Sequence, residues 1–286
     1  MYKCLFCQSE SFTSSPFEDT LFNDKRFEYK TCTSCQLVQV DPLPSLQDLS
    51  KMYAMDYYGF KKLMPNSEFD SILNQIKQHG DYKTVLDFGC GGGRFLVNAI
   101  DKGYQVTGVD FGDELIGHLQ VAYPEAQFQE INTFYEQSEC YDVIFVSNVF
   151  EHLTNPVEVL HKLSQRLHPN GILVVDGPIE NNFTLAGAFR KTLFGIRKKM
   201  GKVVYHAPTH IFYSNATNQK AFFEQSGLST LLYQLVEGAW PFPSQWQTAN
   251  GLKAKCFYIV AKISQTLGIC IPNSGNVFYY IGRKTS

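Results

Sequence analysis

A glycine-rich turn beside an acidic residue is the part of this sequence with the clearest chemistry. Asp87 lies in a short apolar run, and Gly89, Gly91 and Gly93 alternate directly after it. Glycine has no Cβ, so such a turn lets the backbone approach a ligand closely. Asp110 ends the next apolar run, about where a carboxylate meets ribose hydroxyls in nucleotide-binding βαβ units. The spacing therefore predicts a nucleotide-type cofactor at this turn.

Two classes of cofactor could use the turn, and one residue helps to choose between them. A dinucleotide fingerprint has glycine at its third position, where the helix packs tightly. Counting from Gly89 and Gly91, that position holds the bulky Arg94, which argues against a dinucleotide. Asp87 suits a hydrogen bond from a cationic amino group, whereas a phosphate would not lie beside it. A tight strand-to-helix turn that binds no ligand is the remaining alternative.

A second group with metal-binding chemistry lies near the start of the chain. Two Cys-x2-Cys pairs are separated by 24 residues, and such paired thiolates can grip one tetrahedral zinc ion. The module at 1–41 is too small to bury a large core, so the metal would supply its folding free energy. Redox-active pairs are the alternative, although no thioredoxin-like βαβ unit surrounds them. We therefore predict a structural Zn²⁺ ion held by Cys4, Cys7, Cys32 and Cys35.

The central part of the chain alternates strands with helices. The expected strands are 84–88, 105–109, 126–129, 143–146, 171–175, 228–236 and 277–281, and the expected helices are 46–53, 69–79, 93–102, 113–122, 156–167, 216–225 and 252–267. Such alternation predicts an α/β fold, a parallel sheet with helices on both faces. Ligands bind beyond the carboxyl ends of such strands, where Asp87, Asp110, Ser147 and Asp176 are expected. The turn and its carboxylates should therefore meet at one edge.

The bulk composition excludes some classes of protein. The 286 residues carry a formal net charge of −2, which indicates no general affinity for polyanions. The first residues lack the pattern of a signal peptide, and no apolar run reaches the length that spans a bilayer. We therefore expect a cytoplasmic protein.

The motif Asp87-x-Gly89-x-Gly91-x-Gly93 resembles motif I of the class I S-adenosylmethionine-dependent methyltransferases. The segment 141–153, with its Glu-His-Leu ending, resembles their fourth-strand motif, and 167–173 resembles their turn into strand five. The resemblance implies a Rossmann-like, doubly wound, seven-stranded and mostly parallel sheet whose last strand is reversed. The organisation expected from it is a zinc ribbon at 1–41, a connector at 42–66, and a methyltransferase domain at 67–286 with insertions at 178–213 and 240–272.

The same resemblance implies roles for individual residues. The three glycines would hold the methionine part of S-adenosylmethionine, Asp87 its amino group, and Asp110 the ribose hydroxyls. The other implied contacts are Phe111 on the adenine, Glu130 and Ile131 beside it, and Ser147 and Asn148 near the reacting centre. An ordinary core aromatic is the alternative for Phe111.

Transfer of a methyl group from a sulfonium is an in-line displacement, so the protein mainly positions the acceptor. A hydroxyl acceptor needs a base, and histidine is the obvious type. His152 follows the fourth strand, and His206 and His210 flank Pro208 in a linker expected to fold over the pocket. We predict the base among these three, although His152 could instead cap the next helix.

The ribbon, the Pro-Leu-Pro connector and a Tyr57-Tyr58 cluster together resemble one bacterial subgroup of methyltransferases, which acts on sugars, nucleotide-linked sugars and other small molecules. We therefore expect O-methylation of a small-molecule acceptor of surface-polysaccharide type, phosphorylated or lipid-linked. One alternative is an RNA methyltransferase that docks through the ribbon, although the acidic balance of the chain disfavours nucleic acid. A cofactor-binding protein without chemistry is the other.

The basic stretch 190–202 has three interpretations. It could be a solvated helix face, which we favour, or a grip for a phosphate group. Together with the apolar helix 252–267, it could also rest on an anionic membrane surface.

Overall fold

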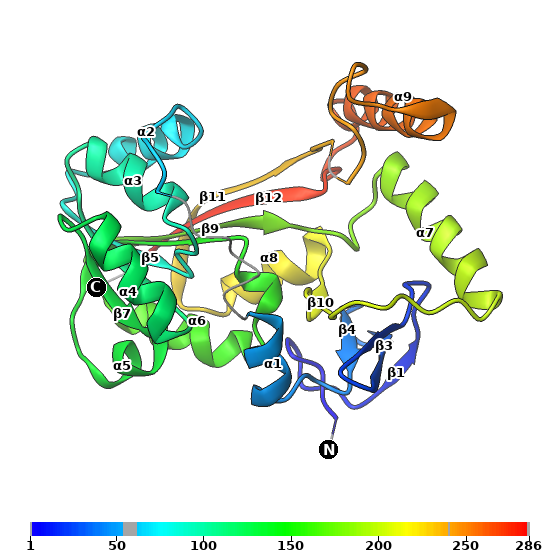
Figure 1. Ribbon diagram of the computed structural model, residues 1–286, viewed down its shortest axis with the longest axis horizontal. Helices are drawn as coiled ribbons and strands as arrows, with labels where there is room; N and C mark the ends of the chain where they lie inside the picture. The colour runs from blue at the N-terminus through cyan, green and yellow to red at the C-terminus, as the bar shows by residue number, and fades with distance from the viewer. Residues whose placement is uncertain (1, 54–61, 240, 285–286) are drawn as a thin grey trace.

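The computed structural model describes residues 2–53, 62–239 and 241–284 (Figure 1). The Tyr57-Tyr58 cluster of the connector lies outside the described residues. The chain forms a large sheet covered by helices, with a small sheet against one end (Figure 1).

The large sheet has seven strands in the order β11-β12-β9-β8-β5-β6-β7. Their bounds are β5 Thr84–Phe88, β6 Gln105–Asp110, β7 Gln127–Glu130, β8 Tyr141–Ser147, β9 Leu167–Pro178, β11 Leu228–Val236 and β12 Val277–Lys284. Strands β5 to β9 are parallel, whereas β12 runs antiparallel to both β9 and β11. The predicted α/β fold with a reversed last strand is therefore confirmed.

Helices cover both faces of this sheet because each presents an apolar stripe to it. One buried cluster joins α2, α3 and α4 to the strands through Ile72, Leu96 and Leu119, and the other joins α6 and α8 through Leu160 and Phe222. The helices are α2 Asp70–His79, α3 Arg94–Asp101, α4 Asp113–Ala122, α5 Ile131–Glu136, α6 Pro156–Gln165 and α8 Ala216–Glu224.

The small sheet contains β1 Phe12–Ser14, β2 Thr20–Phe22, β3 Lys25–Cys32 and β4 Val38–Asp41, and is followed by helix α1 Leu46–Met52. It also takes β10 Phe212–Tyr213 from the far side of the chain, since Phe212 pairs with Gln39 of β4. Phe6 of the ribbon stacks on Phe222 of α8, with ring centroids 4.3 Å apart. The ribbon and the large domain therefore share one core.

Helices α7 Leu185–Lys199 and α9 Gly251–Gly268 lie together beyond one end of the large sheet (Figure 1). Phe189 packs on Phe257 across them, with ring centroids 5.8 Å apart. The sequence pattern predicted α9 but left 178–213 without a defined element. No helix in the described ranges is long and apolar enough to cross a membrane.

Two cations of α7 form ion pairs with the ribbon, whereas we favoured a solvated helix face for the stretch 190–202. Arg197 pairs with Glu18 at 2.8 Å, and Lys198 pairs with Asp19 at 2.8 Å. Lys198 also donates to the backbone carbonyl of Ser15 at 3.1 Å. These two cations therefore fasten the ribbon to α7. The solvated-face interpretation is wrong for Lys198, whose side chain is 23% exposed, whereas the side chain of Arg197 stays 50% exposed.

Candidate cofactor and active site

The glycine turn leaves the end of β5 in a conformation that needs glycine. Gly89, Gly91 and Gly93 have φ of +76°, +49° and +83°, a region that other residues adopt with strain. A Cβ on Gly89 would collide with the side chain of Val149. The alternating glycines thus keep the backbone open toward the space above the sheet.

Asp87 lies beneath this turn and is 3% exposed. Its Oδ2 atom is buried and has no hydrogen-bond partner among the described residues. Burial, and then the charge of Asp110, raises the pKa of Asp87 to about 8. An unpartnered buried carboxylate is costly on its own, so this site fits a ligand with a cationic donor.

Asp110 closes the neighbouring strand β6 and binds the turn from the side. Its Oδ2 accepts the backbone N–H of Gly91 at 2.6 Å, and its Oδ1 accepts that of Phe111 at 2.7 Å. Phe111 is 46% exposed and its ring lies parallel to that of Tyr53, with centroids 6.2 Å apart. The alternative of an ordinary core aromatic is therefore wrong for Phe111.

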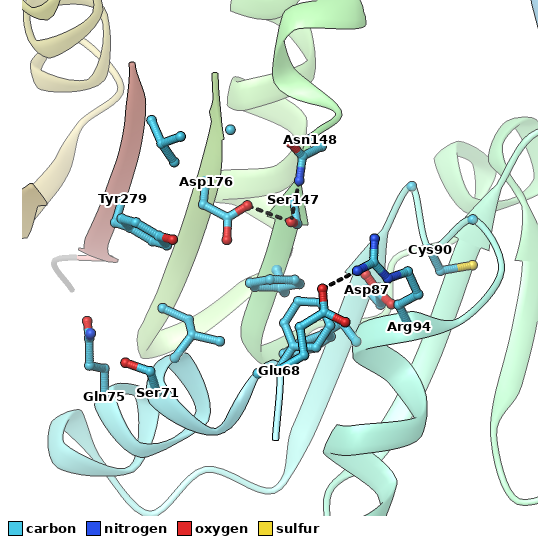
Figure 2. A pocket seen from close by; sticks show the side chains of 18 of the residues that line it. Glu68, Ser71, Gln75, Asp87, Cys90, Arg94, Ser147, Asn148, Asp176 and Tyr279 are labelled. Atoms are coloured by element: carbon cyan, nitrogen blue, oxygen red, sulfur yellow. Dashed lines mark hydrogen bonds and ion pairs between the residues drawn. The ribbon is translucent and has the colours of Figure 1, made fainter. Parts of the chain in front are cut away.

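Two cavities meet at this turn, because Gly89 and Asn148 line both of them. The larger, of about 780 Å³, is lined by Asp87 and by polar side chains from several elements (Figure 2). The smaller, of about 340 Å³, is lined by Asp110, Phe111 and mostly apolar neighbours. Of the predicted adenine neighbours, Ile131 lines the smaller cavity, whereas the carboxylate of Glu130 caps helix α5 by accepting from the N–H of Asn132 at 2.7 Å.

Three hydrogen-bonded residues line one side of the larger cavity. Ser147 Oγ donates to Asp176 Oδ1 at 2.5 Å, and Asn148 Nδ2 donates to Ser147 Oγ at 3.1 Å. Burial raises the pKa of Asp176 to about 6. In Figure 2, Tyr279 of β12 lies beside Asp176, so the reversed strand contributes to the same cavity.

Some residues of the larger cavity were not predicted as site residues. Asp176 was recognised only as a strand end, and its polar type at that position was the available signal. Tyr279 and Gln234 lie on β12 and β11, whose place beside β9 depends on long-range pairing. Glu68, on the segment before α2, also lines the cavity. Its position there depends on how this segment packs in the folded chain, and no local motif indicates it.

Two of the three predicted histidines come together at the end of β8. The rings of His152 and His210 have centroids 5.0 Å apart and meet edge to face. His152 lines the smaller cavity, and its Nδ1 lies 2.5 Å from the carbonyl oxygen of Thr209. That bond assigns the Nδ1–H tautomer and leaves Nε2 as an acceptor. His206 is exposed and lines neither of these cavities.

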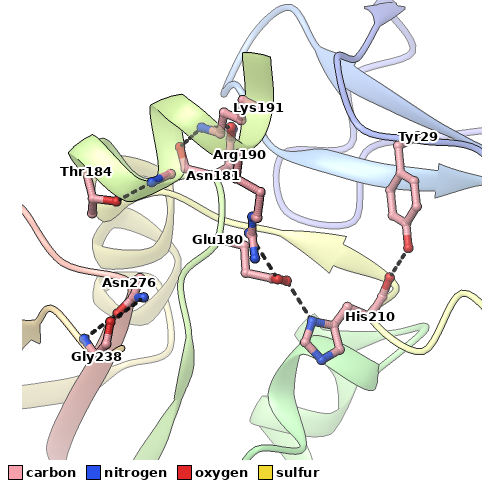
Figure 3. A network of polar contacts seen from close by, with 10 residues as sticks. Tyr29, Glu180, Asn181, Thr184, Arg190, Lys191, His210, Gly238 and Asn276 are labelled. Atoms are coloured by element: carbon pink, nitrogen blue, oxygen red, sulfur yellow. Dashed lines mark hydrogen bonds and ion pairs between the residues drawn. The ribbon is translucent and has the colours of Figure 1, made fainter. Parts of the chain in front are cut away.

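The two histidines differ in charge because their neighbours differ. Burial, and then the charge of His210, lowers the pKa of His152 to about 4, so its ring is neutral. Burial alone would lower the pKa of His210, but Glu180 raises it above the usual value through an ion pair of 2.6 Å. Glu180 also pairs with Arg190 at 3.3 Å, so one carboxylate joins α7 to His210 (Figure 3).

Glu151 completes a group that could hold a divalent cation. Ligand atoms of Glu151, His152 and His210 lie within 4.8 Å of one another. Glu151 Oε2 is buried without a hydrogen-bond partner in the described part of the chain, and burial raises its pKa to about 7.

The four ribbon cysteines lie together as a tetrahedral site requires. The Sγ atoms of Cys4 and Cys35 are 3.5 Å apart, and those of Cys7 and Cys32 are 3.6 Å apart. Zinc–sulfur bonds of about 2.3 Å in a tetrahedron would place the sulfurs roughly 3.8 Å apart. The hydrogen bond between Cys4 and Cys35 lowers the pKa of Cys4 and raises that of Cys35, so Cys4 would ionise first of this pair. The geometry therefore fits one structural Zn²⁺ ion.

Comparisons with known proteins agree with this geometry. A sequence family described as a methyltransferase domain matches residues 56–233. The ubiquinone biosynthesis O-methyltransferase of Nitrosospira multiformis is 32% identical over 142 residues, 43% of this chain and 59% of that protein. The protein of the same name from Rickettsia typhi is 27% identical over 150 residues, 49% of this chain and 57% of that protein. The matches thus span less than two thirds of these relatives.

The fold has solved counterparts. A SAM-dependent methyltransferase from Archaeoglobus fulgidus superposes with a TM-score of 0.50 and 16% identity, over 75% of this chain and 92% of that chain. At this identity the likeness shows the fold alone.

Proposed function

The chain belongs to the methyltransferase-domain family, and we propose that it transfers the methyl group of S-adenosylmethionine to a hydroxyl group of a small polar acceptor. The observation that carries the proposal is the buried, unpartnered Oδ2 atom of Asp87, which lines the larger cavity beside the glycine turn where the two cavities meet. S-adenosylmethionine supplies an activated methyl group and carries a cationic amino group. The chain supplies the matching anion beneath a turn that only glycine can form.

The division of the site into two cavities supports roles for the predicted cofactor residues. The apolar cavity beside Phe111 and Ile131 would take the adenine, and Asp110 the ribose hydroxyls. The glycine turn and Asp87 would hold the methionine part. Asn148 lines both cavities and Ser147 lines the larger one next to it, so the reacting centre would be at these two residues. Glu130 would act through the start of α5, which it caps.

The polar lining of the larger cavity supports a polyhydroxylated acceptor, such as a sugar, a nucleotide-linked sugar or a polysaccharide precursor. Its polar side chains come from Glu68, Ser71, Gln75, Asp176, Gln234 and Tyr279. Carboxylates accept hydrogen bonds from hydroxyl groups, and side-chain amides both accept and donate them, so such a lining can bind several hydroxyls at once. The names of the curated relatives support O-methylation and place their acceptors in ubiquinone biosynthesis. A phenolic hydroxyl is therefore the natural comparison substrate.

For the base we propose His152, which lines the smaller cavity; the acceptor hydroxyl would reach it past Asn148, which lines both cavities. The carbonyl of Thr209 fixes its tautomer, and the neutral ring keeps an acceptor lone pair at Nε2. His210, held by Glu180, would position the His152 ring from its side. His206 was predicted alongside them, but it is exposed and lines neither cavity, so we do not propose it as the base.

A direct test measures methyl transfer with purified, zinc-loaded protein and isotopically labelled S-adenosylmethionine. The acceptor panel would contain free sugars, nucleotide-linked sugars, catechols and RNA, and mass spectrometry would detect the added methyl group. Methylation of a sugar hydroxyl is the expected result. Methylation of catechol alone would replace the sugar by an aromatic acceptor, and methylation of RNA alone would contradict the proposal. Cofactor binding without any product would leave a protein that binds and does not catalyse.

A further inference from the structure

Helix α9 carries its apolar stripe on the outside of the molecule. Leu252, Cys256, Ile259, Ile263 and Leu267 recur at intervals of three or four residues, so they share one helix face. All five are exposed, with Leu252 at 81% and Leu267 at 45%. An ordinary surface helix turns this face toward the core, so the arrangement is inverted.

The opposite face of α9 explains why the stripe points outward. Ala261 and Ser264 are buried there, and Ser264 Oγ accepts the backbone N–H of Ala186 in α7 at 3.0 Å. Glu237, which precedes α9, accepts a hydrogen bond from the same hydroxyl at 2.7 Å. These contacts, together with the packing of Phe257 on Phe189, fix the rotation of α9 and leave the large aliphatic side chains on the free side.

Positive charge borders the stripe on both sides. At 100° per residue, Lys255 and Lys262 lie on one flank and Lys253 on the other. The sequence from 238 to 286 contains no acidic residue, although the whole chain has 27 and a net charge of −2. Trp246, which is 45% exposed, lies under the ammonium group of Lys255 at 4.9 Å. The local charge thus runs against that of the whole chain.

We propose that α9 docks this protein on the surface of an anionic lipid bilayer. The apolar stripe would enter the boundary between headgroups and acyl chains, with the helix lying in the plane of the membrane. The flanking lysines would extend toward the lipid phosphates, each contributing roughly 1 kcal/mol at an anionic surface. Ile269 and Ile271, which are 87% and 40% exposed, prolong the apolar surface directly after α9.

The charge pattern favours a bilayer over a second protein chain. A stripe bordered on both sides by lysine fits a continuous negative plane, whereas a second copy of this helix would bring like charges together. The stripe is also unbroken along the helix from Leu252 to Leu267, as in helices that lie on membranes. After α9 the chain continues into β12, whose Tyr279 lines the larger cavity. Docking would therefore hold the catalytic domain beside the lipid surface.

The test uses zinc-loaded, full-length protein and co-sedimentation with vesicles. Vesicles of phosphatidylglycerol mixed with phosphatidylcholine should bind the protein at low salt, and binding should fall at high salt because surface attraction is screened. Pure phosphatidylcholine vesicles should bind it weakly. Lys255→Gln and Lys262→Gln should each lower partitioning roughly fivefold, whereas the exposed Lys77→Gln on α2 should not.

The apolar half of the proposal has its own variants. Ile259→Gln with Ile263→Gln should reduce partitioning roughly tenfold or more, because both side chains enter the lipid. Val121→Gln on α4, which is 85% exposed, is the matched control and should bind as the original chain does. All these positions are exposed, so thermal unfolding should be unchanged. Failure to bind anionic vesicles, or unaltered binding by the double variant, would overturn the proposal. So would a dimer that the double variant converts to monomer.

Discussion

Asp87 lies one residue before the end of β5 and Asp110 ends the neighbouring parallel strand β6, and the charge of Asp110 adds to burial in raising the pKa of Asp87 to about 8. The two carboxyl groups differ in their partners: Asp110 accepts two backbone N–H groups, whereas Asp87 Oδ2 accepts none among the described residues. Asp110 therefore holds the backbone of the turn, and Asp87 Oδ2 is left to accept a hydrogen bond from a bound ligand.

This difference predicts a pH dependence of cofactor binding. In the free protein Asp87 is protonated below about pH 8, and a cationic amino group binds its deprotonated form. Binding below pH 8 therefore releases a proton, and the affinity should rise by up to about tenfold per pH unit until it levels off above pH 8. Isothermal titration with S-adenosylmethionine from pH 6 to pH 9 measures this. Asp87→Asn should bind weakly with a flat profile; a flat profile for the original chain would refute the assignment.

The pairing of Lys198 with the ribbon predicts a contrast between adjacent lysines. Lys198→Met leaves the buried Asp19, 4% exposed, with Arg26 as its remaining ion-pair partner, and should cost about 1–3 kcal/mol of folding free energy. The neighbouring Lys199→Met is exposed and should change stability by less than about 0.5 kcal/mol. Denaturant unfolding of the two variants compares them. Equal stabilities would show that Lys198 does not fasten the ribbon.

Removal of zinc should destabilise more than the ribbon. The ribbon and the large domain share a core through Phe6, and β4 pairs with β10 close to His210. Chelation should therefore lower both the melting temperature and methyl transfer, and Cys32→Ser should do the same because a three-sulfur site binds zinc less tightly. Elemental analysis should find one zinc per chain. A protein that is metal-free, stable and fully active would contradict the structural zinc site.

Substitution of His152 and of His206 should have different effects on kcat. His152→Asn removes the proposed base and should lower kcat roughly 10²–10⁴-fold, with cofactor affinity little changed. His206→Asn, at an exposed position, serves as the control and should leave kcat within about twofold. Steady-state kinetics on the acceptor that the panel identifies measures both. Comparable losses in the two variants, or none in either, would remove His152 from the proposed role.

The sequence predicted what depends on local pattern. The strand-to-helix alternation gave β5, α4 and β11 with the observed bounds, because apolar periodicity and turn residues act over a few positions. Strand β9 begins at Leu167, before the predicted 171, because Leu167 pairs with Tyr141 across a register shift. Helix α7 was not predicted, because cations such as Lys198 lie on the side that faces the ribbon, and the helix therefore lacks a clear division into apolar and polar faces.

The same division applies to the site. The glycines, Asp87 and Asp110 are close in sequence and carry a motif, so their meeting at the sheet edge was predictable. Tyr279 reaches the larger cavity only because β12 returns beside β9 after a long excursion. The approach of His210 to His152 likewise depends on the pairing of β10 with β4 of the ribbon. These strands are far apart in sequence, so no local pattern predicts their pairing.

The central claim is that the turn above Asp87, braced by Asp110, binds S-adenosylmethionine. Calorimetric titration of zinc-loaded protein at pH 8 tests it most directly. One site per chain is expected, and Asp110→Ala should weaken binding by roughly ten- to a hundredfold through the lost charged hydrogen bonds. Absence of any binding heat, or unchanged affinity after Asp110→Ala, would contradict the account.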